Sequence, residues 1–135
     1  MILGIGIDAV DISRFTKWSS FRPHQLQKIF SQKEIAYCLE KTHLKNQRFA
    51  SVWAAKEALF KALSPLSKNQ TLPFLSLCKA AELTHHPSGY PQVTVAWQQL
   101  APYLSTLQGV GIHISITHTD TQTLAFIVLE KPYFN

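Results

Sequence analysis

The chain has few cysteines, few glycines and no long apolar run. Its 135 residues include only 2 cysteines, Cys38 and Cys78, which lie outside any paired metal-ligand spacing. This pattern argues against a disulfide framework or a cysteine zinc site, so we expect two reduced packing residues. No apolar run reaches the length of a membrane span, which argues against a membrane partner.

Several other signals are also missing. The N-terminus enters strand-like sequence directly and shows neither a basic leader nor a small-residue cleavage site, so we expect a cytoplasmic protein. The chain has no internal repeat, no glycine-rich phosphate loop and no nucleophile elbow. These absences exclude several nucleotide-binding and hydrolase classes.

Acidic residues are scarce, with 8 Asp and Glu against 13 Lys and Arg and a formal charge of +5. Such an excess favours an anionic partner: nucleic acid, a membrane surface, a phosphorylated small molecule or an acidic protein. The basic residues of the first half are spread out, without a dense run or interleaved aromatics, which argues against a nucleic-acid module. They are Arg14, Lys17, Arg22, Lys28, Lys33, Lys41, Lys45 and Arg48.

The hydrophobic content of 46% and the chain length predict a single domain over residues 1–135 with one core. Residues 49–63 lack Gly and Pro and predict a central helix. Ser31 and Glu34 have the spacing of a capping box, which predicts a second helix running to residue 39 or 41. Alternation over 110–117 and again over 124–129 predicts an antiparallel hairpin.

The central helix carries charge among apolar residues. At 3.6 residues per turn, Trp53, Glu57 and Lys61 share one face, and Lys56 lies at its flank. An ordinary helical Glu–Lys pair is one interpretation. The alternative is a site for a metal ion or phosphate, because the apolar surroundings leave Glu57 in need of a counter-ion.

The ends of two predicted strands offer further candidates. Residues 2–7 form a glycine-containing apolar run that predicts a strand packed closely on other backbone, and the run stops at Asp8. Asp8 either caps a following helix or binds a ligand, and the two roles are compatible. In the later strand, Ser115 and Thr117 share one face with His113, which suits either phosphate binding or exposure to solvent. No histidine spacing predicts a zinc site.

Residues 65–109 are less informative. Residues 65–74 predict a loop, 75–83 a strand or an irregular segment, and 92–96 a strand, with a turn at 85–89 between them. Residues 97–107 predict a helix, although Pro102 interrupts its pattern.

Three segments together resemble the small, holo-acyl-carrier-protein synthase branch of the 4′-phosphopantetheinyl transferases. They are Gly4-Ile5-Gly6-Ile7-Asp8, Ala54-Ala55-Lys56-Glu57-Ala58 and His113-Ile114-Ser115-Ile116-Thr117-His118-Thr119. The resemblance implies an α+β fold, in which an antiparallel or mixed sheet packs against a long central helix and shorter helices. It also implies magnesium-dependent transfer of phosphopantetheine from coenzyme A to a serine of an apo acyl carrier protein, a step of fatty acid biosynthesis.

The resemblance also implies residue roles. Asp8 and Glu57 would be the metal carboxylates, Lys61 would stabilise the charge on the phosphate, and a metal-bound water or Glu57 would be the base. Ser115, Thr117 and His118, with Lys61, would hold coenzyme A. The carrier would dock on a basic first helix that presents Arg14, Lys17, Arg22 and Lys28.

Family members of this length are homotrimers with active sites between subunits, so one chain would hold half of each site. The chain departs from the family at Val52, where an arginine is usual, and at Pro65, where a glycine-containing loop is usual. Two other functions fit the residues: a non-catalytic basic module that binds acidic protein or RNA, and a metal-dependent phosphohydrolase.

Overall fold

The computed structural model describes residues 1–105, 107 and 109–133. Its main sheet has the order β1-β5-β4, formed by β1 (Ile2–Asp11), β5 (Gln122–Glu130) and β4 (Gly111–His118). Both pairings are antiparallel, and β4 and β5 form the hairpin that the alternating sequence predicts. The sequence prediction for residues 110–129 is therefore confirmed.

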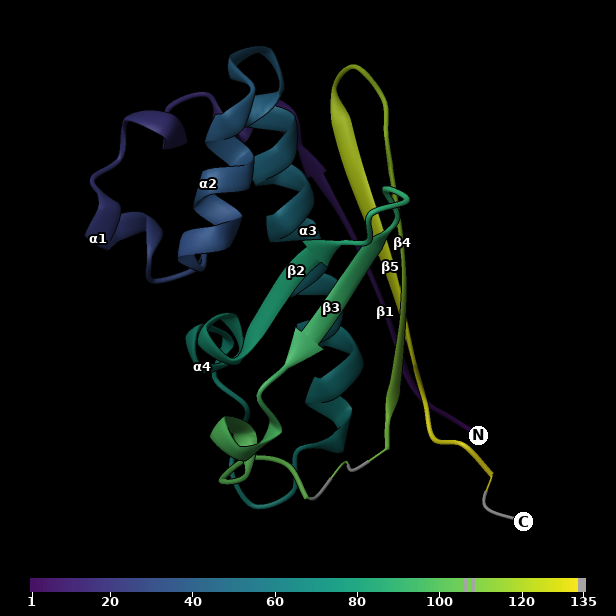
Figure 1. Ribbon diagram of the computed structural model, residues 1–135. Coiled ribbons are helices and arrows are strands. Elements are labelled where there is room, and N and C mark those ends of the chain that lie inside the picture. The colour runs from purple at the N-terminus through teal and green to yellow at the C-terminus, as the bar shows by residue number, and fades with distance from the viewer. Residues whose placement is uncertain (106, 108, 134–135) are drawn as a thin grey trace.

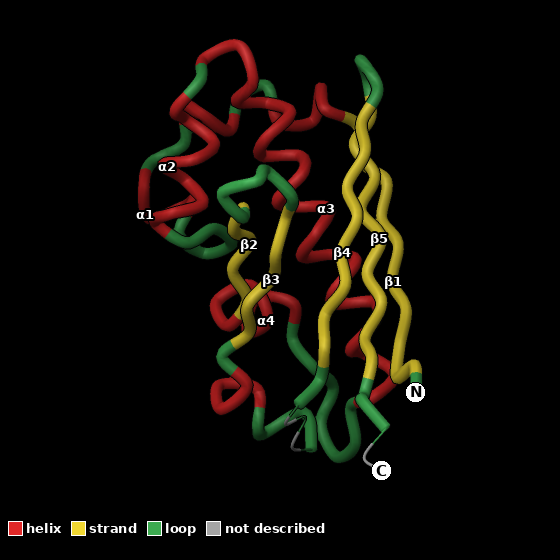
Figure 2. Tube along the Cα trace, turned by 45° about the vertical axis from the view of Figure 1, so that its right-hand side comes forward, coloured by secondary structure: helices red, strands yellow, loops and turns green. Residues whose placement is uncertain are grey.

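The central helix α3 (Lys45–Leu63) begins four residues before the predicted start and ends as predicted. It packs on β1 and β5, as Figure 2 shows. Its buried side chains are mainly alanine and branched or aromatic residues, which form the core together with Ala125, Ile127 and Leu129 of β5. Small residues on the face toward the sheet allow helix and strand backbones to approach each other closely.

That approach is closest at Gly4 and Gly6 of β1. A Cβ atom added at Gly4 would lie 2.3 Å from the carbonyl oxygen of Ala62, and one at Gly6 would lie 1.8 Å from that of Ala58. Real Cβ atoms do not occupy such positions, so β1 requires glycine where it crosses α3. The predicted close packing of this strand on other backbone is confirmed.

Helix α2 (Gln32–Glu40) begins with the predicted capping box. Ser31 Oγ accepts from the Glu34 amide at 3.2 Å, and Glu34 Oε1 accepts from the Ser31 amide at 2.8 Å. The short α1 (Pro23–Leu26) precedes it. The two hydrogen bonds of the capping box satisfy backbone amides that would otherwise be unpaired at the start of α2.

The middle of the chain differs from its prediction. Residues 74–80 form the helix α4 (Phe74–Ala80), where we expected a strand or an irregular segment, and β2 (Ala81–His85) follows. β2 pairs with β3 (Pro91–Val95) in a separate antiparallel sheet, which confirms the strand expected at 92–96. The helix expected over 97–107 is reduced to the 3-10 turn Trp97–Leu100, and residue 106 lies outside the described residues.

Figures 1 and 2 show α3 between two layers. The β1-β5-β4 sheet covers one side, and α1, α2, α4 and the β2–β3 hairpin cover the other. The predicted α+β class, with antiparallel sheets around a long central helix, is confirmed. Within residues 1–105, 107 and 109–133, no helix combines the length and apolarity needed to cross a bilayer. Cys38 and Cys78 are free and buried, and burial raises the pKa of each thiol to about 12.

Candidate active site

Asp8 and Lys61 meet at the free edge of β1. Lys61 Nζ donates to Asp8 Oδ1 at 3.1 Å and to the Ile7 carbonyl oxygen at 2.9 Å. The Asp8 side chain is 15% exposed, whereas that of Lys61 is 51% exposed. β1 continues to Asp11, so the predictions that the strand ends at Asp8 and that Asp8 caps a helix are wrong. Side-chain alternation along the strand turns Asp8 toward α3 instead.

Glu57 lies one helical turn before Lys61 on α3 and close to the Asp8 carboxylate. Burial raises the pKa of Glu57 and the charge of Asp8 raises it further, while Lys61 and Arg14 act in the opposite direction. A carboxylate whose pKa is raised by partial burial and a like charge is typical of functional sites. The Asp8 and Glu57 carboxylates beside the Lys61 amine suit a ligand that carries a cation and a phosphate.

Arg14 also reaches this site. It belongs to the 3-10 turn Ile12–Phe15, and its guanidinium carbon lies 4.9 Å from the centroid of the Trp53 ring. Trp53 precedes Glu57 by one turn of α3, which explains the effect of Arg14 on the Glu57 pKa. The sequence predicted Arg14 as a docking residue only. Its position six residues after Asp8, in the turn that directly follows the same strand, is the signal that could have placed it here.

The fully buried charge on α3 is Lys56 rather than Glu57. Lys56 Nζ lies 2.7 Å from Glu34 Oε1, and the two side chains are 3% and 0% exposed. The sequence placed Lys56 at the flank of a mixed face and assigned the missing counter-ion to Glu57. The apolar residues on both sides of Lys56 were the available signal, but its partner on α2 could not be read from helical spacing.

Asp8 and Glu57 are suited to a hard cation. Among the described residues, no three side chains of His, Cys, Asp or Glu gather in a way that could hold a metal ion. Mg²⁺ is commonly bound by one or two carboxylates, with waters and substrate phosphates completing its shell. The donor set therefore fits Mg²⁺ and does not fit zinc.

Ser115, Thr117 and His118 lie on β4, two strands away from Asp8. Asp8 pairs with Ala125 of β5, and Ala125 pairs with Ile116 of β4. Directly paired residues point to the same face, so Ile116 faces α3 while Ser115 and Thr117 face away. One chain therefore does not bring these hydroxyls together with Asp8 and Glu57. The predicted common face of His113, Ser115 and Thr117 is confirmed, and all three are exposed.

The face of the sheet that points away from α3 is here called the outer face; it is polar along β4, at His113, Ser115 and Thr117, and carries exposed apolar side chains on β1 and β5. Ile5, Ile7 and Phe126 on it are 61%, 53% and 40% exposed. A hollow of about 270 Å³ at its β1 edge is lined by Ile5, Gly6, Ile7, Phe126 and Lys61. Lys61 therefore borders both the Asp8 carboxylate and this hollow on the outer face.

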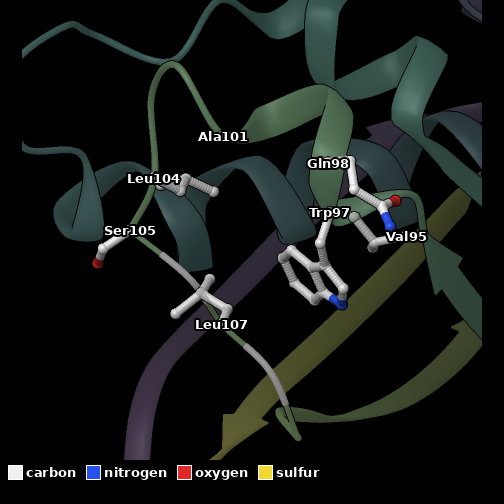
Figure 3. A pocket seen from close by; sticks show the side chains of 7 residues that line it. All are labelled: Val95, Trp97, Gln98, Ala101, Leu104, Ser105 and Leu107. Carbon is white, nitrogen blue, oxygen red and sulfur yellow. The ribbon is translucent and has the colours of Figure 1, made fainter.

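A larger pocket, of about 620 Å³, lies between the end of β3 and the chain that follows it. Figure 3 shows Trp97, Leu104 and Leu107 around this space, while the hydroxyl of Ser105 points away from the Trp97 ring. Among the described residues that line it, none is titratable and none belongs to the candidate site. Volume alone does not make this pocket the reaction site.

The predicted docking residues lie on several short turns instead of one basic helix. Arg14 lies on the turn Ile12–Phe15, Lys17 precedes the turn Trp18–Ser20, and Arg22 and Lys28 flank α1. All four are exposed. The expectation of a single basic first helix is wrong, because β1 extends to Asp11 and Pro23 starts a new helix.

The fold and this site define a small α+β protein with two carboxylates and a lysine between a strand and a central helix, as expected of an enzyme that transfers a phosphate-linked group. The family model of the 4′-phosphopantetheinyl transferase superfamily matches residues 4–127. The chain belongs to this superfamily.

Its relatives match along nearly their whole length. The holo-[acyl-carrier-protein] synthase of Geotalea daltonii is 34% identical over 97% of this chain and 100% of its own. The one from Treponema pallidum is 33% identical over 96% and 97%. The solved holo-(acyl-carrier-protein) synthase of Bacillus anthracis, in complex with CoA (3′,5′-ADP), is 25% identical with a TM-score of 0.72 and coverage of 98% and 99%.

Proposed function

We propose that Asp8, Glu57 and Lys61 transfer 4′-phosphopantetheine from coenzyme A to a serine of an apo acyl carrier protein, releasing adenosine 3′,5′-bisphosphate. The observation that carries the proposal is their meeting at the β1 edge, where Lys61 Nζ lies 3.1 Å from Asp8 Oδ1 and the Asp8 charge acts on Glu57. Holo-[acyl-carrier-protein] synthases of similar length support the same activity. One domain over residues 1–135 would carry it in the cytoplasm.

Each residue has a role that its position supports. Asp8 and Glu57 would hold Mg²⁺, which supplies positive charge to the pyrophosphate of coenzyme A. Lys61, half exposed at the same edge, would donate to the phosphate oxygens as negative charge develops on them. Glu57, with its raised pKa, is suited to take the proton of the attacking serine.

The complete site needs a second copy of the chain. Ser115 and Thr117 face away from Asp8 within one chain, and His118 ends the same strand. The exposed Ile5, Ile7 and Phe126 give the outer face the apolar character of an interface, and Lys61 borders it. We propose a homotrimer in which the Ser115, Thr117 and His118 of one subunit hold the nucleotide of coenzyme A beside Asp8 and Glu57 of the next.

Introducing a charge on the outer face should separate the subunits. Phe126 lies on the central strand of the sheet and is 40% exposed, so we expect Phe126→Glu to reduce the mass in light scattering from three chains to one and to abolish transfer. Leu39→Glu is the matched control, because Leu39 is 43% exposed on α2, away from the sheet. A Phe126→Glu monomer with full activity would contradict the shared site.

Mixing two inactive variants distinguishes a shared site from a simple need for assembly. Glu57→Ala and Ser115→Tyr subunits, mixed under exchange conditions, should regain part of the transfer rate. Some interfaces in mixed trimers then combine an intact Glu57 with an intact Ser115 of the neighbour. No recovery, with exchange verified by mass spectrometry of tagged subunits, would place both residues in one chain's site.

The exposed basic residues at Lys17, Arg22 and Lys28 would bind the acidic face of the carrier protein. We expect the double variant Lys17→Glu and Lys28→Glu to lower kcat/KM for the carrier about tenfold at low salt, with the difference shrinking as salt screens the charges. Lys79→Glu on α4 is the control, because it makes the same change of charge at a position outside the docking segment. An equal loss in that control, or a loss independent of salt, would contradict docking on this segment.

The direct test of the function is the intact mass of apo acyl carrier protein after incubation with the protein, coenzyme A and Mg²⁺. A phosphopantetheine mass gain that disappears without metal supports the proposal. Breakdown of coenzyme A without a carrier would instead support a phosphohydrolase. Tight carrier or RNA binding with no mass gain on several carriers would support a non-catalytic basic module.

A further inference from the structure

The buried Glu34–Lys56 pair joins several segments of the protein. Lys56 Nζ donates to the Ile29 carbonyl at 2.6 Å and to the Cys78 carbonyl at 2.9 Å, and it lies 2.7 Å from Glu34 Oε1. An ammonium has three donors, so all are used. The acceptors come from the α1–α2 connection, from α4 and from α2. This lysine therefore connects α3 to three other parts of the chain.

Glu34 extends the network further. Its Oε1 accepts from the Ser31 amide at 2.8 Å, and its Oε2 accepts from the Leu83 amide of β2 at 2.8 Å. Its side chain is 0% exposed. A charge in such a position is costly to desolvate, and an apolar pair of equal volume is often as stable. The stability of the fold alone therefore does not account for an ion pair here.

The position of the pair on α3 indicates what it does. Lys56 directly precedes Glu57, and Ala58 follows it with a carbonyl against Gly6 of β1. Successive residues are rotated by about 100° around a helix. Lys56 thus holds α3 from the α2 side and Ala58 holds it from the sheet side, which leaves Glu57 one orientation, next to Asp8.

We propose that the Glu34–Lys56 pair is a positioning element that sets the rotation of α3, so that Glu57 meets Asp8 and the metal. This inference rests on the proposed function. Because Lys56 also holds the Ile29 carbonyl, the pair links the segment that follows the docking residues to the reacting carboxylate. Removing the pair should change the geometry of the metal site in molecules that remain folded.

The test compares Lys56→Met and Glu34→Gln with Ser31→Ala. The Ser31 variant loses the 3.2 Å cap of α2 but keeps the pair. Near-UV circular dichroism of the tryptophans gives the folded fraction, and electron paramagnetic resonance gives Mn²⁺ affinity of the protein saturated with coenzyme A. We expect Lys56→Met to weaken Mn²⁺ binding about tenfold per folded molecule. Its kcat should fall by about 10- to 100-fold, while KM for coenzyme A changes little.

Glu34→Gln keeps the size of the side chain and should give a smaller loss of Mn²⁺ affinity in the same direction, so it decides the question if Lys56→Met does not fold. Ser31→Ala should lower stability alone. If Lys56→Met or Glu34→Gln loses stability but binds Mn²⁺ and turns over like the wild type per folded molecule, the positioning role is overturned while the proposed function stands. A wild-type protein that neither binds Mn²⁺ nor transfers phosphopantetheine would overturn the proposed function, and this role with it.

Discussion

Glu57→Ala should abolish phosphopantetheine transfer while the protein stays folded. Glu57 is one of the two carboxylates that we propose to hold the metal, and its pKa is raised by burial and by Asp8. Loss of a metal ligand removes several kcal/mol of transition-state charge stabilisation, so we expect a rate reduction on the order of 10³-fold or more. The measurement is intact mass of the apo carrier against time, with coenzyme A and Mg²⁺ in excess.

Glu57→Gln provides the control for folding. In the folded state the raised pKa means that ionisation of Glu57 costs more than in the unfolded chain, so this carboxylate destabilises the metal-free protein at pH values above its folded pKa. Replacing it with the neutral amide should leave the thermal midpoint at pH 7 unchanged or higher, with transfer still lost. If Glu57→Gln transfers phosphopantetheine at close to the wild-type rate, Glu57 does not belong to the reaction site.

The sequence predicted those elements that depend on local pattern. The apolar, Gly- and Pro-free composition of 49–63 defines α3, and strict alternation over 110–117 defines β4. The spacing of Glu57 and Lys61 also placed both on one helix face. Here the tertiary contacts reinforce what propensity and period already favour. The part of the proposed site that lies on α3 and its neighbouring strand could therefore be predicted from the sequence.

The sequence predictions are wrong where tertiary contacts determine the local structure. Asp8 looked like the end of a strand because the apolar run stops there, but pairing with Ala125 of β5 carries β1 on to Asp11. Residues 74–80 contain apolar residues that suit strand or helix alike, and packing against α3 selects the helix α4. Lys56 was placed at a flank because its partner, Glu34, comes from α2.

The position of Ser115 and Thr117 has a different cause. Their face of β4 is set by register, since Ile116 pairs with Ala125 and so turns toward α3. Alternation along β4 predicted that the two hydroxyls share a face, but it could not relate that face to Asp8 two strands away. The strand order β1-β5-β4 supplies this relation, and it is what points to a neighbouring subunit.

Gly6→Ala should strongly destabilise the protein. Its Cβ would lie 1.8 Å from the Ala58 carbonyl oxygen, which is backbone of α3 and has no rotamer by which to move away. Overpacking of this kind costs about 3 kcal/mol, and more where backbone must shift. We expect the thermal midpoint to fall by roughly 10 °C or more, as measured by circular dichroism.

Gly111→Ala is the matched control, because Gly111 is also a strand glycine of the same sheet. Its added Cβ would lie 3.5 Å from His113 Nε2 and 3.7 Å from the Glu130 carbonyl oxygen, which are ordinary van der Waals distances, so its thermal midpoint should stay close to that of the wild type. The folded fraction of Gly6→Ala should also transfer more slowly, since moving β1 away from Ala58 separates Asp8 from Glu57. Equal thermal midpoints of the two variants would show that β1 can move away from α3 without loss of stability. The contact between them would then not set the distance between the two carboxylates.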